Sequence, residues 1–274
     1  MKIAFAKPAI PTQGCAIVAL AEGAKLSGAA AALDKKTKGA ISRAISAGAF
    51  VPKREKTLVI AGPAGTKLSK IVVIGLGDAG SVETKAAEKI GAIAYDQAAS
   101  ESAATVILPA GNGTKLGSDT KGAATVAAHL ACGAALKAYR FDKYRTKEDK
   151  DAKPKLKSLT VVTDAHVEAK RLYGPLAALV EGVKFTRDLV SEPANVLYPE
   201  SFVARCLPLK KDGLQIEVLG VKEMQRLGMG ALLGVGQGSA KESRLLVMRW
   251  MGARDKNARP LALVGKGVCF DTGG

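Results

Sequence analysis

Aromatic residues are scarce in this sequence, which holds one Trp, five Tyr and six Phe among 274 residues. Since 47% of the residues are nevertheless hydrophobic, the core must be built mainly from aliphatic side chains. The sequence also lacks any run of eighteen apolar residues, and its N-terminus has no apolar stretch of the kind that directs secretion. These absences argue against a membrane span or a secreted protein and predict a cytoplasmic location.

Cysteine and histidine are also few. The four cysteines lie far apart and the only histidines are His129 and His166, so no pair has the close spacing of a zinc site. We interpret the cysteines as reduced thiols in a cytoplasmic protein. They are Cys15, Cys132, Cys206 and Cys269.

Acidic residues are outnumbered by basic ones, which gives a formal net charge of +16. Residues 1–165 contribute +11 of this, from 25 basic and 14 acidic side chains. A basic surface attracts nucleic-acid phosphates, so nucleic-acid binding through the N-terminal part is one hypothesis. The densest stretch, Lys137–Lys157, mixes nine basic with four acidic residues and has no regular interleaving of aromatics, a pattern more typical of a solvated surface segment.

Short β-type runs alternate with Ala-rich helical stretches, which predicts an α/β fold with helices on the faces of a sheet. Expected strands are residues 2–6, 16–20, 57–61, 70–75, 104–108, 159–163, 214–219, 244–250 and 261–264. Expected helices are residues 35–47, 81–97, 120–139, 165–189 and 221–227. We place a domain junction at the start of the helix 165–189, which divides the chain into residues 1–164 and 165–274.

The segment Gly75–Gly80 (GLGDAG) lies between an expected strand and an expected helix. In dinucleotide-binding proteins glycines at such a turn allow close approach of a pyrophosphate. Here the third glycine comes one position too early, and no acidic residue ends a second strand about twenty residues later. A simple strand-to-helix turn is therefore the favoured interpretation, with a phosphate site as the alternative.

Three segments in the second half carry a more specific signal: Arg187–Pro199 (RDLVSEPANVLYP), Gly228–Ser239 (GMGALLGVGQGS) and Val264–Gly274 (VGKGVCFDTGG). The first has prolines that end one helix and begin another, and the second has glycines that indicate close backbone packing. Taken in this order, the three segments resemble the leucyl aminopeptidase family of two-metal cytosol aminopeptidases.

The resemblance implies metal-binding roles for two residues of the third segment. Lys266 matches the lysine whose neutral amine binds the tighter metal site, and Asp271 matches the carboxylate that bridges both metals. Both roles suit the chemistry, because a bridging carboxylate holds two ions close together and only an unprotonated amine can donate to a metal. Cys269 lies between them, but with no histidine nearby in sequence we expect a small buried side chain rather than a nucleophile or a zinc thiolate.

The family also implies a fold and a function. We expect an α/β protein with a small N-terminal α/β domain, followed by a linker helix and the truncated start of a metallo-aminopeptidase catalytic domain. The intact protein is expected to use two divalent ions, Mn or Zn, to release N-terminal amino acids, leucine preferred, from peptides with a free N-terminus, and to form a homohexamer. The family's other catalytic residues have no counterpart up to Gly274, so we expect no catalytic residues within the chain and no activity from the 274 residues alone.

Overall fold

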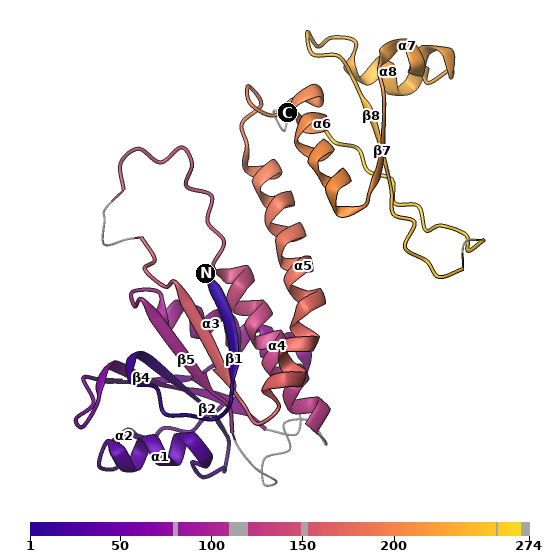
Figure 1. Cartoon of the computed structure of the whole chain (residues 1–274). Helices are drawn as coiled ribbons and strands as arrows, with labels where there is room; N and C mark the ends of the chain where they lie inside the picture. The colour runs from indigo at the N-terminus through magenta and orange to yellow at the C-terminus, as the bar shows by residue number, and fades with distance from the viewer. Residues whose placement is uncertain (79–81, 110–119, 149–152, 256, 270–274) are drawn as a thin grey trace. The chain divides into compact units, whose positions relative to one another are not determined.

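The computed structural model describes residues 1–78, 82–109, 120–148, 153–255 and 257–269, with the side chains of residues 120 and 121 left out (Figure 1). The chain forms two compact units, residues 1–185 (unit 1) and 186–274 (unit 2). The division lies within the long helix α5, His166–Ser191. The boundary expected between residues 164 and 165 stays a prediction about the domains of the whole protein.

Unit 1 is built on a six-stranded sheet with the order β1-β6-β5-β2-β4-β3, in which only β3 runs antiparallel to its neighbour. The strands are β1 Lys2–Ala6, β2 Gln13–Ala21, β3 Thr57–Ala61, β4 Lys67–Gly77, β5 Ala103–Ile107 and β6 Ser158–Val162. The central strands are near-continuous apolar runs, as parallel strands covered on both faces must be. The α/β class expected from the sequence is therefore present.

Helices cover both faces of this sheet (Figure 1). Helices α3 (Thr84–Ala98) and α4 (Thr120–Lys137) pack on one face around Ile17, Val72 and Leu159. Helices α1 (Gly28–Lys36) and α2 (Ala40–Ala47) lie over the other face, where residues such as Leu33 and Ile71 are fully buried. Two covered faces give unit 1 a core of aliphatic side chains.

Glycines set the spacing between α3 and α4. A Cβ atom on Gly91 would lie 1.9 Å from the Leu130 carbonyl oxygen, and one on Gly133 would lie 1.9 Å from the Glu88 carbonyl oxygen. Backbone therefore contacts backbone at this crossing, which no larger residue permits. Between the same helices, His129 Nδ1 lies 2.7 Å from a carboxylate oxygen of Glu88.

The helix expected over residues 35–47 is wrong in one respect, because the structure has two helices there. The chain reverses at Lys38 (φ 54°) and Gly39 (φ 78°), and α2 begins at Ala40. The Asp34 carboxylate accepts hydrogen bonds from the backbone amides of Ile41 (2.8 Å) and Ser42 (3.1 Å). Asp34 thus satisfies first-turn amides of α2 from the preceding helix, a side-chain cap that periodicity alone does not reveal.

The glycines at the carboxyl end of β4 are explained by packing. A Cβ atom on Gly75 would lie 2.1 Å from the Lys53 carbonyl oxygen, and Gly77 has a positive φ of 68°. Both positions therefore need glycine because of the neighbouring turn, without any ligand. Ala79 and Gly80 of the same motif lie outside the described residues.

Unit 2 has fewer residues in helices and strands than unit 1. After α5 come α6 (Pro199–Cys206), the 3-10 helix η3 (Leu207–Asp212), α7 (Val221–Arg226) and α8 (Gly230–Gly236), together with β7 (Gln215–Leu219) and β8 (Leu245–Arg249). The two strands pair antiparallel, with Gln215 opposite Arg249. Helix α8 lies in the glycine-rich segment, for which the sequence had indicated only close packing.

The strand expected over residues 261–264 is absent from this described part of the chain. Leu261, Leu263 and Val264 are 87%, 90% and 98% exposed. A strand needs a neighbour for its backbone hydrogen bonds, and β8 already pairs with β7 without a third described strand beside it. An apolar run can predict a strand, but it does not supply that neighbour. Among the described residues, no helix is long and apolar enough to cross a membrane.

Candidate functional site

The third sequence segment is described only as far as Cys269. Lys266 lies on an exposed stretch without regular secondary structure, and its side chain is exposed. Asp271, the second expected metal ligand, lies outside the described residues. The position of Lys266 relative to Asp271 is therefore outside what the structure describes, and the roles of both residues stay predictions.

The described residues do not form a metal centre by themselves. No three His, Cys, Asp or Glu side chains within the described ranges come together in a way that could hold an ion. The two histidines lie in unit 1, where His129 pairs with Glu88 and His166 begins α5. Of the two ligands that the resemblance implies, only the Lys266 amine is described, and one donor cannot hold a pair of ions.

Cys269 is partly buried, and its thiol lies 3.8 Å from the Gly267 carbonyl oxygen. Burial raises the pKa of this thiol, which disfavours the thiolate that a nucleophile or a metal ligand requires. The other three cysteines are buried free thiols. Burial raises the pKa of Cys15 to about 11, an effect that Lys70 opposes and Glu101 reinforces. Cys15, Cys132 and Cys206 fill space in the core and are protonated at neutral pH.

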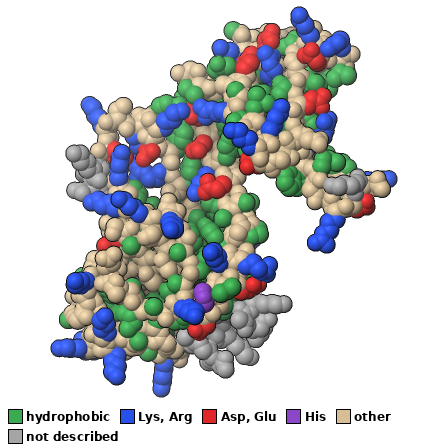
Figure 2. Space-filling view, viewed as in Figure 1, with side chains coloured by type: hydrophobic (Ala, Val, Ile, Leu, Met, Phe, Trp, Pro, Cys, Tyr) green, Lys and Arg blue, Asp and Glu red, His purple; other side chains and the backbone are tan. Residues whose placement is uncertain are grey.

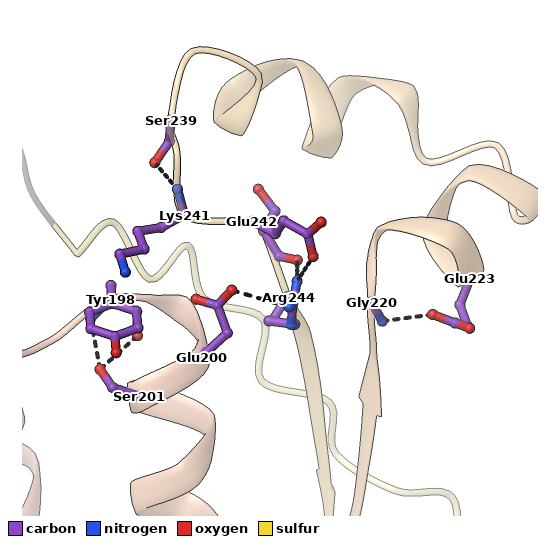
Figure 3. Close-up of polar contacts among 10 residues, drawn as sticks. Tyr198, Glu200, Ser201, Gly220, Glu223, Ser239, Lys241, Glu242 and Arg244 are labelled. Carbon is purple, nitrogen blue, oxygen red and sulfur yellow. Dashed lines mark hydrogen bonds and ion pairs between the residues drawn. The ribbon is translucent and has the colours of Figure 1, made fainter.

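A polar network in unit 2 connects residues at the end of the first sequence segment and just after it with residues that follow the second segment (Figure 3). Arg244, just before β8, donates to Glu200 of α6 at 3.1 Å and to Glu242 at 3.0 Å. The Lys241 ammonium lies 4.2 Å from the centre of the Tyr198 ring, close enough for a cation–π contact. The loop between α8 and β8 is thereby held against the start of α6.

Side chains in the same part of unit 2 also fix the starts of two helices (Figure 3). Ser201 Oγ accepts from the Tyr198 amide (2.9 Å) and donates to the Val196 carbonyl (2.8 Å). The Gly220 amide donates to the Glu223 carboxylate at 3.0 Å, which caps α7. Sequence reasoning missed the partnership of Glu200 with Arg244, since residues 44 positions apart show no periodic signal. An acidic residue in the first turn after Pro199 was the one available hint.

Part of the mixed-charge segment of residues 137–157 is held together by ion pairs around Glu148. The Glu148 side chain is 10% exposed and pairs with Arg140, with Arg145 at 3.8 Å and with Lys153 at 3.6 Å. Arg140 also reaches Asp142 at 3.6 Å. The side chains around Glu148 thus pair with one another, while basic residues still outnumber acidic ones in the described part of this segment.

Comparison with known proteins identifies the class. Residues 17–148 match the N-terminal domain of the cytosol aminopeptidase family, and residues 184–274 match the catalytic domain of the same family. The chain therefore belongs to the cytosol aminopeptidase family. This result confirms the expected fold class, an N-terminal α/β domain followed by part of the catalytic domain.

Individual relatives agree with this assignment. The chain is 46% identical over 278 residues to a probable cytosol aminopeptidase of Caulobacter vibrioides, covering 100% of this chain and 54% of that protein. A probable cytosol aminopeptidase of Sinorhizobium fredii is 40% identical over 273 residues, covering 98% of this chain and 53% of that protein. The chain thus spans about half the length of the curated relatives it matches.

Two solved structures share the fold. A variant of tomato leucine aminopeptidase superposes with a TM-score of 0.80 at 22% identity, covering 100% of this chain and 55% of that chain. The bottromycin maturation enzyme BotP, in complex with Mn, superposes with a TM-score of 0.64 at 24% identity, covering 85% of this chain and 44% of that chain. At these identities the likeness concerns the fold alone.

Proposed function

We propose that the whole protein to which this chain belongs is a metal-dependent aminopeptidase that releases N-terminal amino acids from peptides, with leucine preferred. The observation that carries the proposal is the match of residues 184–274 to the family's catalytic domain, because this range contains the whole segment Val264–Gly274. The names of the curated relatives support the reaction class. Leucine preference rests on the resemblance to leucyl aminopeptidases.

We assign Lys266 and Asp271 as metal ligands in that whole protein, with two divalent ions, Mn or Zn, as the cofactors. The manganese in the BotP structure supports the choice of Mn. A pair of divalent ions supplies a Lewis acid for the peptide carbonyl and an activated water. Since these two ligands cannot hold two ions by themselves, we expect the 274-residue chain alone to be inactive.

Assembly and location follow from the same proposal. We propose a homohexamer in the cytoplasm, supported by the family resemblance and by the relatives' designation as cytosol aminopeptidases. Peptides with a free N-terminus are the expected substrates. Sedimentation of the whole protein as six copies would agree with this arrangement, whereas a monomer at micromolar concentration would contradict it.

Hydrolysis of leucine p-nitroanilide tests the proposed reaction. The whole protein, dialysed against a chelator and then given Mn²⁺ or Zn²⁺, is expected to release nitroaniline only after metal addition. The matched control substrate, N-acetyl-leucine p-nitroanilide, lacks a free amine and should remain uncleaved. Absence of hydrolysis with either metal, or equal cleavage of the blocked substrate, would contradict an aminopeptidase.

A further inference from the structure

The two edge strands of the sheet in unit 1 differ in how open they are to a further strand. At one edge, β1 contains Lys2 and is followed directly by Lys7 and Pro8, residue types that discourage edge-to-edge pairing. At the other edge, β3 has the sequence TLVIA, and no charged residue occurs from Thr57 to Thr66. β3 therefore has neither charge nor proline to prevent pairing.

The hydrogen bonds between β3 and β4 determine which backbone groups of β3 point outward. Just after β3, the Gly62 amide donates to the Ser69 carbonyl of β4 at 2.9 Å. In an antiparallel pair, alternate residues bond to the neighbouring strand, so the even-numbered residues of β3 face β4. The N–H and C=O groups of Thr57, Val59 and Ala61 therefore point away from β4. Since β3 is the last strand in the described order of the sheet, these groups face no further described strand.

The side chain of Val59 adds an apolar surface at this edge. Val59 lies opposite Val72 of β4, so the two side chains are on the same face of the sheet. Val72 is fully buried in the core beneath α3 and α4, whereas Val59 is 50% exposed. The helix layer thus leaves an apolar side chain of β3 open, directly beside unpaired backbone groups.

Positive charge elsewhere on unit 1 restricts where two copies of the chain can meet. Residues 1–165 carry +11, and Figure 2 shows Lys and Arg side chains over much of the visible face of unit 1. Two such surfaces repel each other. β3 contributes no charge to such an encounter, so its edge is a favourable place for contact between copies.

A second copy of β3 fits this edge. In an antiparallel pair centred on Val59, the two Val59 residues face each other and Thr57 lies opposite Ala61 of the second copy. Each outward amide then donates to an outward carbonyl of the other copy. Lys56 lies opposite Gly62, so no like charges meet across the pair. We propose that unit 1 self-associates through two-fold pairing of β3, which joins two sheets edge to edge. This inference does not depend on the proposed aminopeptidase activity.

The side chains of β3 favour a second copy over a bound peptide. Domains that add a peptide strand to a sheet edge select its side chains with pockets beside that edge. Next to its outward backbone groups β3 presents only the small side chains of Thr57, Val59 and Ala61. A copy of the same strand needs no pockets, because Val59 packs directly against Val59 of the other copy as a cross-strand pair.

Sedimentation equilibrium tests the proposal on the full 274-residue chain. The wild type is expected to exchange between monomer and dimer at concentrations of about 1 to 100 μM, since the interface is small. Val59→Lys places two ammonium groups opposite each other and should weaken dimerisation at least about tenfold. The matched control is Val167→Lys, at a position of α5 that is 72% exposed. It makes the same chemical change away from β3 and should leave dimerisation unchanged.

Cysteine crosslinking tests the register of the pair independently. The variants carry Cys269→Ser, because the other three cysteines are buried. Val59→Cys should form a disulfide between copies on oxidation, since facing residues of a hydrogen-bonded pair have Cα atoms about 5.5 Å apart. Ala61→Cys, on the same edge, should not, because its two copies would lie about 14 Å apart. Circular dichroism of each variant should match the wild type.

Several results would overturn the proposal. The first is a wild-type chain that stays monomeric at about 100 μM. The second is equal weakening of dimerisation by Val59→Lys and Val167→Lys, and the third is equal crosslinking of the Val59→Cys and Ala61→Cys variants. A fourth is binding of a fluorescein-labelled peptide of sequence TLVIA by a chain that remains monomeric, which would assign the edge to an extended peptide instead.

Discussion

Units 1 and 2 differ most in how they use their apolar residues. Unit 1 buries aliphatic side chains on both faces of its sheet. Unit 2 has five buried apolar side chains among its described residues, while large apolar ones on and beyond β8 are exposed. The buried five are Leu189, Leu197, Val203, Cys206 and Met224. Burial of apolar surface is the dominant stabilising term in folding, so most of this chain's stability should reside in unit 1.

Unit 2 relies more visibly on polar contacts. Ion pairs join Arg205 to Glu192, Arg244 to Glu200, and β7 to β8. Such contacts define local geometry, but exposed pairs add little to folding free energy. The units can be followed separately, because the single tryptophan, Trp250, lies in unit 2, whereas most helix and strand lies in unit 1.

The largest expected contrast comes from matched leucine substitutions. Leu159→Ala, at a fully buried position of unit 1, should lower the free energy of unfolding by about 2–5 kcal/mol because it leaves a cavity. Leu263→Ala, at a position 90% exposed, should change it by less than about 0.5 kcal/mol. Urea unfolding followed by far-UV circular dichroism measures the free energy of unfolding of both variants. Similar losses of that free energy in the two variants would contradict the difference in burial between Leu159 and Leu263.

A smaller effect is expected at the crossing of α3 and α4. Gly133→Ala forces apart two backbones in contact and should cost about 1–3 kcal/mol, seen as an earlier circular dichroism transition. The fluorescence change of Trp250 should keep its midpoint if unit 2 unfolds independently.

The matched glycine control lies on α5. Gly182→Ala places a Cβ atom in open space on a helix and should raise stability by up to about 1 kcal/mol. Equal destabilisation by both glycine variants would mean that the close approach of α3 and α4 does not exist in solution.

The next largest loss of stability is expected from the buried ion pair of unit 2. The Glu192 carboxylate is 3% exposed and lies 2.8 Å from Arg205 Nη2. Arg205→Ala removes this partner from a buried carboxylate and should cost about 1–2 kcal/mol, observed in the Trp250 transition. Adding Glu192→Gln to the same chain should recover part of the loss. No recovery would mean that the cost comes from lost packing of the arginine rather than from the lost ion pair.

The smallest effect is a pH dependence of α7. The Glu223 carboxylate accepts hydrogen bonds from the Glu223 backbone amide and from the Gly220 amide, and both lower the pKa of Glu223. A carboxyl group with a lowered folded pKa stabilises the native state above its unfolded pKa, and this contribution disappears as the pH falls through the folded pKa. Acid should therefore weaken amide protection in residues 220–226, and Glu223→Gln should abolish that dependence. An unchanged acid response in the variant would assign it to another group.

Much of unit 1 could be predicted from its sequence because its signals are local. All six strands lie where apolar runs predicted them, and the long helix beginning near residue 165 follows from its composition. The break between α1 and α2 was missed, since it depends on Asp34 reaching forward to cap another helix. Contacts between residues far apart in the sequence, such as Glu200 and Arg244, could not be predicted either.

The candidate site residues could be predicted only from the resemblance to a family. One Lys and one Asp five residues apart carry little information, and only three matching segments in order made Lys266 and Asp271 candidates. The strand expected just before them failed, because hydrophobicity predicts burial and cannot specify the neighbouring strand. The roles of both residues therefore depend on the whole protein.

Substitution of Asp271 in the whole protein tests the proposed function most directly. Asp271→Ala should abolish hydrolysis of leucine p-nitroanilide at saturating Mn²⁺ and reduce bound metal, measured by mass spectrometry, below two ions per chain. Asp271→Asn, which keeps the shape of the side chain but loses its charge, should fail in the same way. Near-normal activity or a full complement of metal in either folded variant would contradict the assignment of Asp271 as the bridging ligand.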